Sequence, residues 1–156
     1  QLLQYLDKCV DDGYEGIVTR NPEGIYKDGK STVKQGFLLK LKPHMDTEGV
    51  LVRFVEMQHN MNPTKKDKLG YTKRSSSKVG KIPAGTAGSC ILEWEGEEIK
   101  VGFGKGFTKD KRQEMWDNSS KYIGKTFKFK YQEVTKDGQP RFGKLLGERH
   151  PDDSNI

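Results

Sequence analysis

Two lysines two residues apart have the types and spacing to do chemistry. Lys40 and Lys42 fall in the run Leu38-Leu39-Lys40-Leu41-Lys42-Pro43. Residues i and i+2 of a β-strand lie on one face, so both amines would project from the same side. Neighbouring ammonium groups repel, and an anion between them, such as a phosphate oxygen, relieves the repulsion. An edge strand that uses lysines to discourage aggregation is the alternative.

A carboxylate precedes these lysines at the start of another short segment. Glu15 opens the run Glu15-Gly16-Ile17-Val18-Thr19-Arg20, directly after the turn Asp12-Gly13-Tyr14. Hard cations prefer oxygen ligands, so Glu15 could hold a magnesium ion beside a phosphate. The alternative is a solvated turn residue.

Near the carboxyl end, Arg141 and Arg149 flank Lys144. Arginine is a planar, permanently charged fork that can bind two oxygens of a phosphate. A basic strand that touches a DNA backbone without chemistry is the alternative. In their order along the chain, the three segments together indicate nucleotidyl transfer onto a polynucleotide.

The positive charge of the chain is concentrated in one segment. The 28 basic and 22 acidic residues give a net charge of +6. Residues 64–81 contain one acidic residue, Asp67, and seven basic ones, so they account for the whole excess. Such a patch is typical of a surface that binds a polyanion, and the predicted DNA-binding residues are Lys65, Lys66, Lys68, Lys73, Arg74, Lys78 and Lys81.

Composition restricts the compartment and the class of protein. Cys9 and Cys90 are far apart and have no Cys or His at ligand spacing, which argues against disulfides and structural zinc. No apolar run approaches the roughly 20 residues of a membrane helix, so no membrane partner is expected. We therefore expect a cytoplasmic monomer.

Residues 1–45 read as part of a larger sheet. Apolar residues at helical spacing predict a helix from Leu2 to Val10, which Gly13 ends. Strands are expected over 15–20 and 37–42, with a surface loop over 21–36. Two strands cannot form a core by themselves, so we expect poor order in this segment unless upstream strands complete the sheet.

Residues 46–156 read as a small Greek-key barrel of the OB type. A helix should begin after the N-cap Thr108 and run to about Ser120, with Met115 and Trp116 buried. Residues 58–84 are expected to be a long loop, and Lys136 to Gly138 a turn. Strands are expected over 49–57, 87–95, 98–103, 127–131 and 142–146, the second and third joined at Glu95-Gly96. The predicted fold is thus mainly β with one or two helices.

Taken together, these segments resemble the ATP-dependent DNA ligases of the covalent nucleotidyltransferase superfamily, closest to the compact phage type. Residues 15–20 are similar to motif IV, 25–30 to the loop that follows it, and 38–43 to motif V. Segments 85–89 and 101–108 are similar to parts of the OB domain. Asp46 and residues 48–50 resemble the interdomain hinge, and motif VI is represented by Arg141-Phe142-Gly143 and Arg149, followed by Asp152 and Asp153. Gly143 stands where motif VI usually has proline, and Arg20 where lysine is frequent.

The resemblance implies an activity and a role for each residue. Residues 1–45 would be the C-terminal fragment of an adenylation domain and 46–156 an OB-fold DNA-binding domain. The family uses ATP and Mg²⁺ to seal nicks in double-stranded DNA through enzyme–AMP and DNA-adenylate intermediates. Glu15 would bind the metal, Lys40 and Lys42 the α-phosphate. Arg141, Lys144 and Arg149 would orient the leaving pyrophosphate, with Asp46 as the hinge between domains.

The lysine nucleophile of this family lies in a Lys-x-Asp-Gly motif, which does not occur in this chain. It would precede Gln1 in the missing N-terminal part of the adenylation domain, so we expect a fragment that is inactive alone. Two alternatives stay open. One is a non-catalytic OB-fold nucleic-acid-binding module, and the other is the equivalent part of an RNA ligase or a capping guanylyltransferase.

Overall fold

The computed structural model describes residues 1–149, and Asp152 and Asp153 lie outside this range. The chain divides into two compact units, Gln1–Met45 and Asp46–Ile156. Within the described range, no helix has the length and apolar character that crossing a membrane requires.

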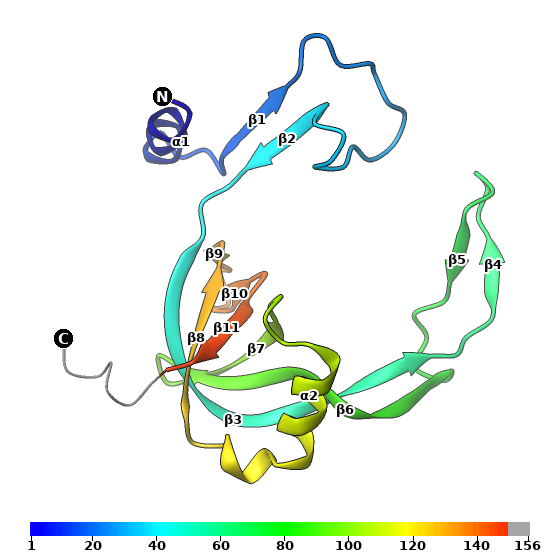
Figure 1. The fold of residues 1–156 in the computed structure, drawn as a ribbon, viewed down its shortest axis with the longest axis vertical. Coiled ribbons are helices and arrows are strands. Elements are labelled where there is room, and N and C mark those ends of the chain that lie inside the picture. Colours follow the sequence, from blue (N-terminus) through cyan, green and yellow to red (C-terminus); the bar gives the residue numbers. More distant parts are fainter. Residues whose placement is uncertain (150–156) are drawn as a thin grey trace. The chain divides into compact units, whose positions relative to one another are not determined.

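The first unit consists of a helix and a two-stranded antiparallel ribbon (Figure 1). Helix α1 (Leu2–Asp11) ends where the backbone N–H of Gly13, at a φ of +87°, donates to the carbonyl of Val10. Strand β1 (Ile17–Arg20) pairs with β2 (Leu38–Leu41), and the loop 21–36 between them contains no strand or helix. Leu6 is the one buried hydrophobic residue of residues 1–45, so these elements enclose no core of their own.

The second unit is a closed five-stranded barrel. Its strands are β3 (Met45–Asn60), β6 (Lys81–Trp94), β7 (Glu97–Phe103), β8 (Thr126–Tyr131) and β11 (Lys144–Glu148). They follow the order β11-β7-β6-β3-β8, in which β11 lies parallel to β7 and antiparallel to β8. Helix α2 (Lys109–Asp117) connects β7 to β8. A five-stranded Greek-key barrel of this kind is the OB fold, which confirms the predicted fold class.

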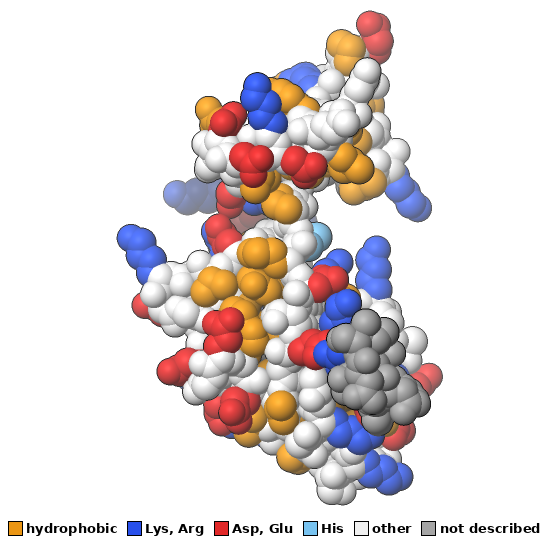
Figure 2. All heavy atoms as spheres, turned by 90° about the vertical axis from the view of Figure 1, so that its left-hand side faces the viewer, with side chains coloured by type: hydrophobic (Ala, Val, Ile, Leu, Met, Phe, Trp, Pro, Cys, Tyr) orange, Lys and Arg blue, Asp and Glu red, His pale blue; other side chains and the backbone are white. Residues whose placement is uncertain are grey.

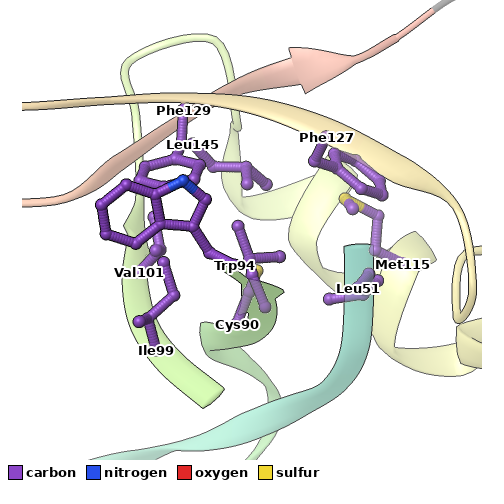
Figure 3. Packing of buried hydrophobic residues seen from close by; sticks show 10 residues of the cluster. Leu51, Cys90, Trp94, Ile99, Val101, Met115, Phe127, Phe129 and Leu145 are labelled. Atoms are coloured by element: carbon purple, nitrogen blue, oxygen red, sulfur yellow. The ribbon is translucent and has the colours of Figure 1, made fainter. Parts of the chain in front are cut away.

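Alternation along the strands builds the barrel core. Cys90, Leu92 and Trp94 of β6 are buried in this core. Phe127 and Phe129 of β8 belong to the same cluster as Cys90 and Trp94 (Figure 3). The Trp94 and Phe129 rings meet edge to face, with centroids 5.8 Å apart, a favourable aromatic geometry. The predicted hairpin is also confirmed, because Glu95 and Gly96 both adopt the positive φ that a tight two-residue turn requires.

Helix α2 covers one end of this core. As predicted, the Thr108 hydroxyl accepts a hydrogen bond from the backbone N–H of Lys111, and Met115 is fully buried. Trp116 is only half buried, contrary to the prediction, because consecutive helical residues point about 100° apart and Met115 already faces the barrel. The helix ends at Asp117, and a short 3₁₀ turn (Ser119–Lys121) continues to the predicted limit.

The expectation of a long loop over 58–84 is wrong. Strand β3 continues to Asn60, β6 begins at Lys81, and a hairpin of β4 (Thr64–Lys66) and β5 (Thr72–Arg74) projects between them. All residues of β4 and β5 are exposed, so the apolar alternation that predicts strands is missing.

The end of the chain also differs from the prediction. The last strand starts at Lys144 rather than Phe142, because Phe142 has a φ of +58° that a strand does not accommodate. Before it, β9 (Glu133–Val134) and β10 (Pro140–Arg141) form an unpredicted two-stranded ribbon around the expected turn.

Candidate functional site

The first cluster of predicted site residues lies where β1 and β2 meet. The Lys42 ammonium donates to the Glu15 carboxylate at 2.9 Å, although 27 residues separate them in the sequence. Gly16 makes this approach possible. A Cβ at that position would lie 2.2 Å from the Leu41 carbonyl oxygen, and its φ of +149° is rare for other residues. The pairing of β1 with β2 therefore places one carboxylate and one ammonium group side by side.

Lys40 lies in different surroundings from Lys42. It is exposed on β2 opposite Val18, whereas Lys42 follows the last residue of that strand. Lys40 also lines a cavity of about 600 Å³ whose walls come from the loop 21–36 and β2, and Lys42 is not part of that wall. The two lysines thus lie near the same end of the ribbon, and Lys42 contacts Glu15.

The second cluster lies on the barrel unit and contains the predicted arginines. Arg141 on β10 forms an ion pair with Glu133, its partner in the β9–β10 register. Its guanidinium lies 5.3 Å from the centre of the Phe142 ring, a cation–π contact. Phe142 is 62% exposed and holds a left-handed backbone conformation. A strained backbone at an exposed, bulky residue is typical of functional sites. The sequence contains no signal that predicts the backbone conformation of Phe142.

Lys144 and Arg149 stand at the two ends of β11. Lys144 begins the strand opposite Gly102 of β7, over which its side chain passes. Just after the strand, Arg149 pairs with the carboxylate of Glu48 near the start of β3. Nearby, the Lys128 ammonium lies 3.9 Å from the carboxylate of Asp46, the predicted hinge residue. The barrel thus brings Arg149 next to Glu48, near the start of β3.

The third cluster is the basic hairpin. Lys65 and Lys73 lie directly opposite each other in the β4–β5 register, where like charges repel unless an anion lies between them. Lys68 lies in the turn between the strands, and Lys78 precedes β6, whose first residue is Lys81. Arg74 differs, because its guanidinium donates to the Asn60 carbonyl at 2.6 Å and so helps to hold the hairpin.

The tip of the hairpin carries exposed apolar side chains that the sequence interpretation did not select. The Asp67 carboxylate accepts hydrogen bonds from the backbone N–H groups of Leu69 and Tyr71, both at 2.9 Å. This turn leaves Leu69 80% and Tyr71 69% exposed. On the face that Figure 2 shows, hydrophobic side chains gather in a band on the barrel unit, and charged side chains lie on either side of it.

A further group of titratable residues, on α2 and next to the 3₁₀ turn, has a structural role. The Tyr122 hydroxyl donates to the Glu114 carboxylate at 2.7 Å, and the Lys111 ammonium donates to it at 2.9 Å. The hydrogen bonds from Tyr122 and Lys111 hold the pKa of Glu114 below its usual range. The pKa of Lys111 is raised by its hydrogen bonds to the Tyr122 hydroxyl, at 3.0 Å, and to the Glu114 carboxylate. They tie α2 to the 3₁₀ turn behind it. Within residues 1–149, no group of three or more His, Cys, Asp or Glu side chains could hold a metal by itself.

Comparison with known proteins supports the resemblance found in the sequence. Residues 80–149 match the family described as the DNA ligase OB-like domain. A DNA ligase of African swine fever virus (isolate Warthog/Namibia/Wart80/1980) is 38% identical over 56 residues, which cover 36% of this chain and 13% of the viral protein. The crystal structure of Chlorella virus DNA ligase-adenylate aligns with a TM-score of 0.50 and 33% identity, covering 96% of this chain and 46% of that one.

A Lig E DNA ligase structure aligns with a TM-score of 0.63 and 25% identity, covering 95% of this chain and 45% of that one. This chain therefore spans less than half the length of these two solved relatives. The resemblance to the DNA ligases is therefore confirmed, and so is the OB fold.

Proposed function

We propose that this chain is part of an ATP-dependent DNA ligase, a family whose C-terminal part it resembles. The whole enzyme would seal nicks in duplex DNA through enzyme–AMP and DNA-adenylate intermediates, and this chain would be inactive alone. Residues 1–45 would supply the closing strands of the adenylation domain, and residues 46–156 the DNA-binding OB domain. The observation that carries the proposal is the contact between Glu15 and Lys42. This contact brings together the two segments that resemble motifs IV and V.

The Glu15–Lys42 pair suits a phosphate with its metal ion. Phosphoryl transfer is accelerated mainly by positioning and by stabilising charge, which a lysine beside a carboxylate provides. Glu15 would be one oxygen ligand of Mg²⁺, and the remaining ligands would come from water and from phosphate, as is usual for this ion. Lys42 and Lys40 would contact the α-phosphate of ATP, which supplies the adenylyl group.

The barrel would contribute a second set of cations. Arg141, Lys144 and Arg149 would orient the leaving pyrophosphate, and Asp46 would be the hinge that allows the barrel to turn afterwards toward DNA. Each of the two arginines is paired with a carboxylate in the structure, so a phosphate group would have to replace that carboxylate.

The β4–β5 hairpin would hold the DNA. Its facing lysines, Lys65 and Lys73, are both exposed, and a phosphate backbone would neutralise their mutual repulsion. Contacts of this kind give affinity without sequence preference, as nick sealing requires.

Binding of the full chain to three labelled nucleic acids tests the proposal. We expect the affinity to be highest for nicked duplex, lower for the same duplex without the nick, and lowest for single-stranded RNA. Equal affinity for all three would contradict the ligase function and favour the non-catalytic OB module. A preference for the RNA would favour an RNA ligase or a capping enzyme.

A further inference from the structure

We propose that Glu48 is an internal counter-ion of Arg149, which an incoming polyphosphate displaces. Glu48 then sets how tightly this arginine binds anions. The inference rests on the proposed function, because it concerns an arginine assigned there to the leaving pyrophosphate. It starts from the ion pair between the two side chains, which spans 101 residues of sequence.

Local strand pairing does not dictate this contact. Strands β3 and β11 are not neighbours in the barrel, because both lie next to β8. Glu48 and Arg149 therefore reach each other across β8 at the rim. The backbone N–H of Arg149 donates to the Thr126 carbonyl at 2.9 Å, which fixes the position from which the guanidinium extends. The pair of Arg141 and Glu133 differs, since those residues are simple cross-strand partners.

The surroundings of the pair form a small charged cavity. Its volume is about 360 Å³, within the range of small-molecule sites. Glu48, Arg149, Lys128 and Glu148 all line it. The two remaining charges are each matched by a neighbour, because Lys128 lies 3.9 Å from Asp46 and Glu148 lies 2.5 Å from Lys125. Each charged side chain that lines the cavity is therefore paired with an opposite charge, and each carboxylate of the lining holds the place that an anion would take.

Partial exposure allows the exchange. The side chains of Arg149 and Glu48 are 32% and 34% exposed, so a dissolved anion can reach the guanidinium without unfolding of the barrel. A guanidinium that is two-thirds covered is unfavourable without a counter-ion, and phosphate offers it the same two-oxygen geometry as a carboxylate. Phosphate can bind only while Arg149 is released from Glu48. The apparent affinity of Arg149 for phosphate is therefore its intrinsic affinity multiplied by the fraction of time that the arginine is released. The return of Glu48 would likewise favour the departure of pyrophosphate.

Calorimetric titration of the full chain with inorganic pyrophosphate tests this exchange. In Glu48→Gln the competing charge is gone, and we expect binding about five- to tenfold tighter than in the wild type. The matched control is Glu148→Gln. It removes the same charge from the same rim, one residue from Arg149, but breaks the pair with Lys125 instead. We expect its affinity to stay within about twofold of the wild type.

The possible results separate this inference from the proposed function. Equal gains in both variants would overturn it, because they would reflect only the lower negative charge of the rim, and so would an unchanged affinity in Glu48→Gln. A loss of binding in Arg149→Ala without a gain in Glu48→Gln would overturn the role of Glu48 and leave that of Arg149 intact. Unchanged binding in Arg149→Ala would overturn both. Glu48→Asp, which keeps the charge on a shorter side chain, should fall between wild type and Glu48→Gln if the barrel stays folded.

Discussion

The side chain of Asn62 donates to the carbonyl oxygen of Ser77 at 2.9 Å and closes the base of the β4–β5 hairpin. The same amide donates to the side chain of Asn60 at 2.8 Å, and Asn62 is 9% exposed. It packs so closely on Gly80 that a Cβ there would lie 2.3 Å from its oxygen. A hairpin without an apolar core is therefore attached to the barrel by buried amide hydrogen bonds.

Replacing Asn62 should loosen this hairpin. In Asn62→Ala, we expect a loss of about 1–2 kcal/mol in the free energy of unfolding, because several hydrogen bonds disappear at a largely buried position. Trypsin should then cleave faster after the hairpin lysines. Asn118→Ala is the matched control, since it removes a comparable amide bond, to the Glu114 carbonyl, at the end of α2. Equal cleavage rates in both variants would show that Asn62 does not hold the hairpin.

The two units should differ in amide-exchange protection. Strands β2 and β6 both make ladder hydrogen bonds, but β6 contributes Cys90 and Leu92 to a closed core, whereas β2 contains no buried residue. Protection follows the stability of the cooperative unit rather than the mere presence of a hydrogen bond. We expect the β2 amides to exchange far faster than those of β6, measured by mass spectrometry on the full chain. Strong protection over residues 38–41 would contradict this.

The barrel was predictable from the sequence because each of its strands has an apolar face. Phe127 and Phe129, or Cys90 and Leu92, recur at every second residue, and burial imposes that period. Thr108 was recognisable as an N-cap for a similarly local reason, since its hydroxyl serves a backbone N–H three residues away.

The hairpin and the ion pairs were not predictable in this way. The strands β4 and β5 are stabilised by the hydrogen bond from Asn62 to Ser77, and both residues lie outside these strands. No sequence pattern within residues 64–74 could predict this bond. Arg149 could be selected as a phosphate ligand from its type, but its partner Glu48 depends on the two strands that flank β8. Long-range pairing of this kind follows from topology rather than from spacing.

The hairpin lysines should affect DNA binding and stability in opposite directions. In Lys65→Gln/Lys73→Gln, we expect weaker binding to nicked duplex and a salt dependence whose logarithmic slope falls by about 1–2, since each phosphate contact contributes about 0.9. Because the two lysines oppose each other across the ribbon, the chain itself should be slightly more stable. Lys136→Gln, on the exposed turn after β9, is the control and should leave the slope unchanged. An unchanged slope in the double variant would exclude these lysines from the DNA contact.

The chain should not form a covalent AMP adduct by itself. Glu15, Lys40 and Lys42 are present, but the sequence contains no Lys-x-Asp-Gly to provide the nucleophile. After incubation with Mg²⁺ and ATP labelled in the α-phosphate, we expect no label on the protein in a denaturing gel. A reaction without Mg²⁺ is the control for nonspecific labelling. Label that appears only with Mg²⁺ would show that another lysine acts as the nucleophile.

Burial of Cys90 should make the barrel less stable at alkaline pH. Desolvation raises the pKa of the Cys90 thiol from 9.0 to about 12, so the folded barrel keeps the proton that the unfolded chain releases. The unfolded state then binds fewer protons above pH 9, and the free energy of unfolding falls as the pH rises from 9 toward 12. Cys90→Ala should be less stable at neutral pH because it leaves a small cavity, but its stability should decline less steeply with pH. Urea unfolding of both proteins at pH 7, 9 and 10 measures the two slopes, and parallel slopes would show that the buried thiol does not contribute.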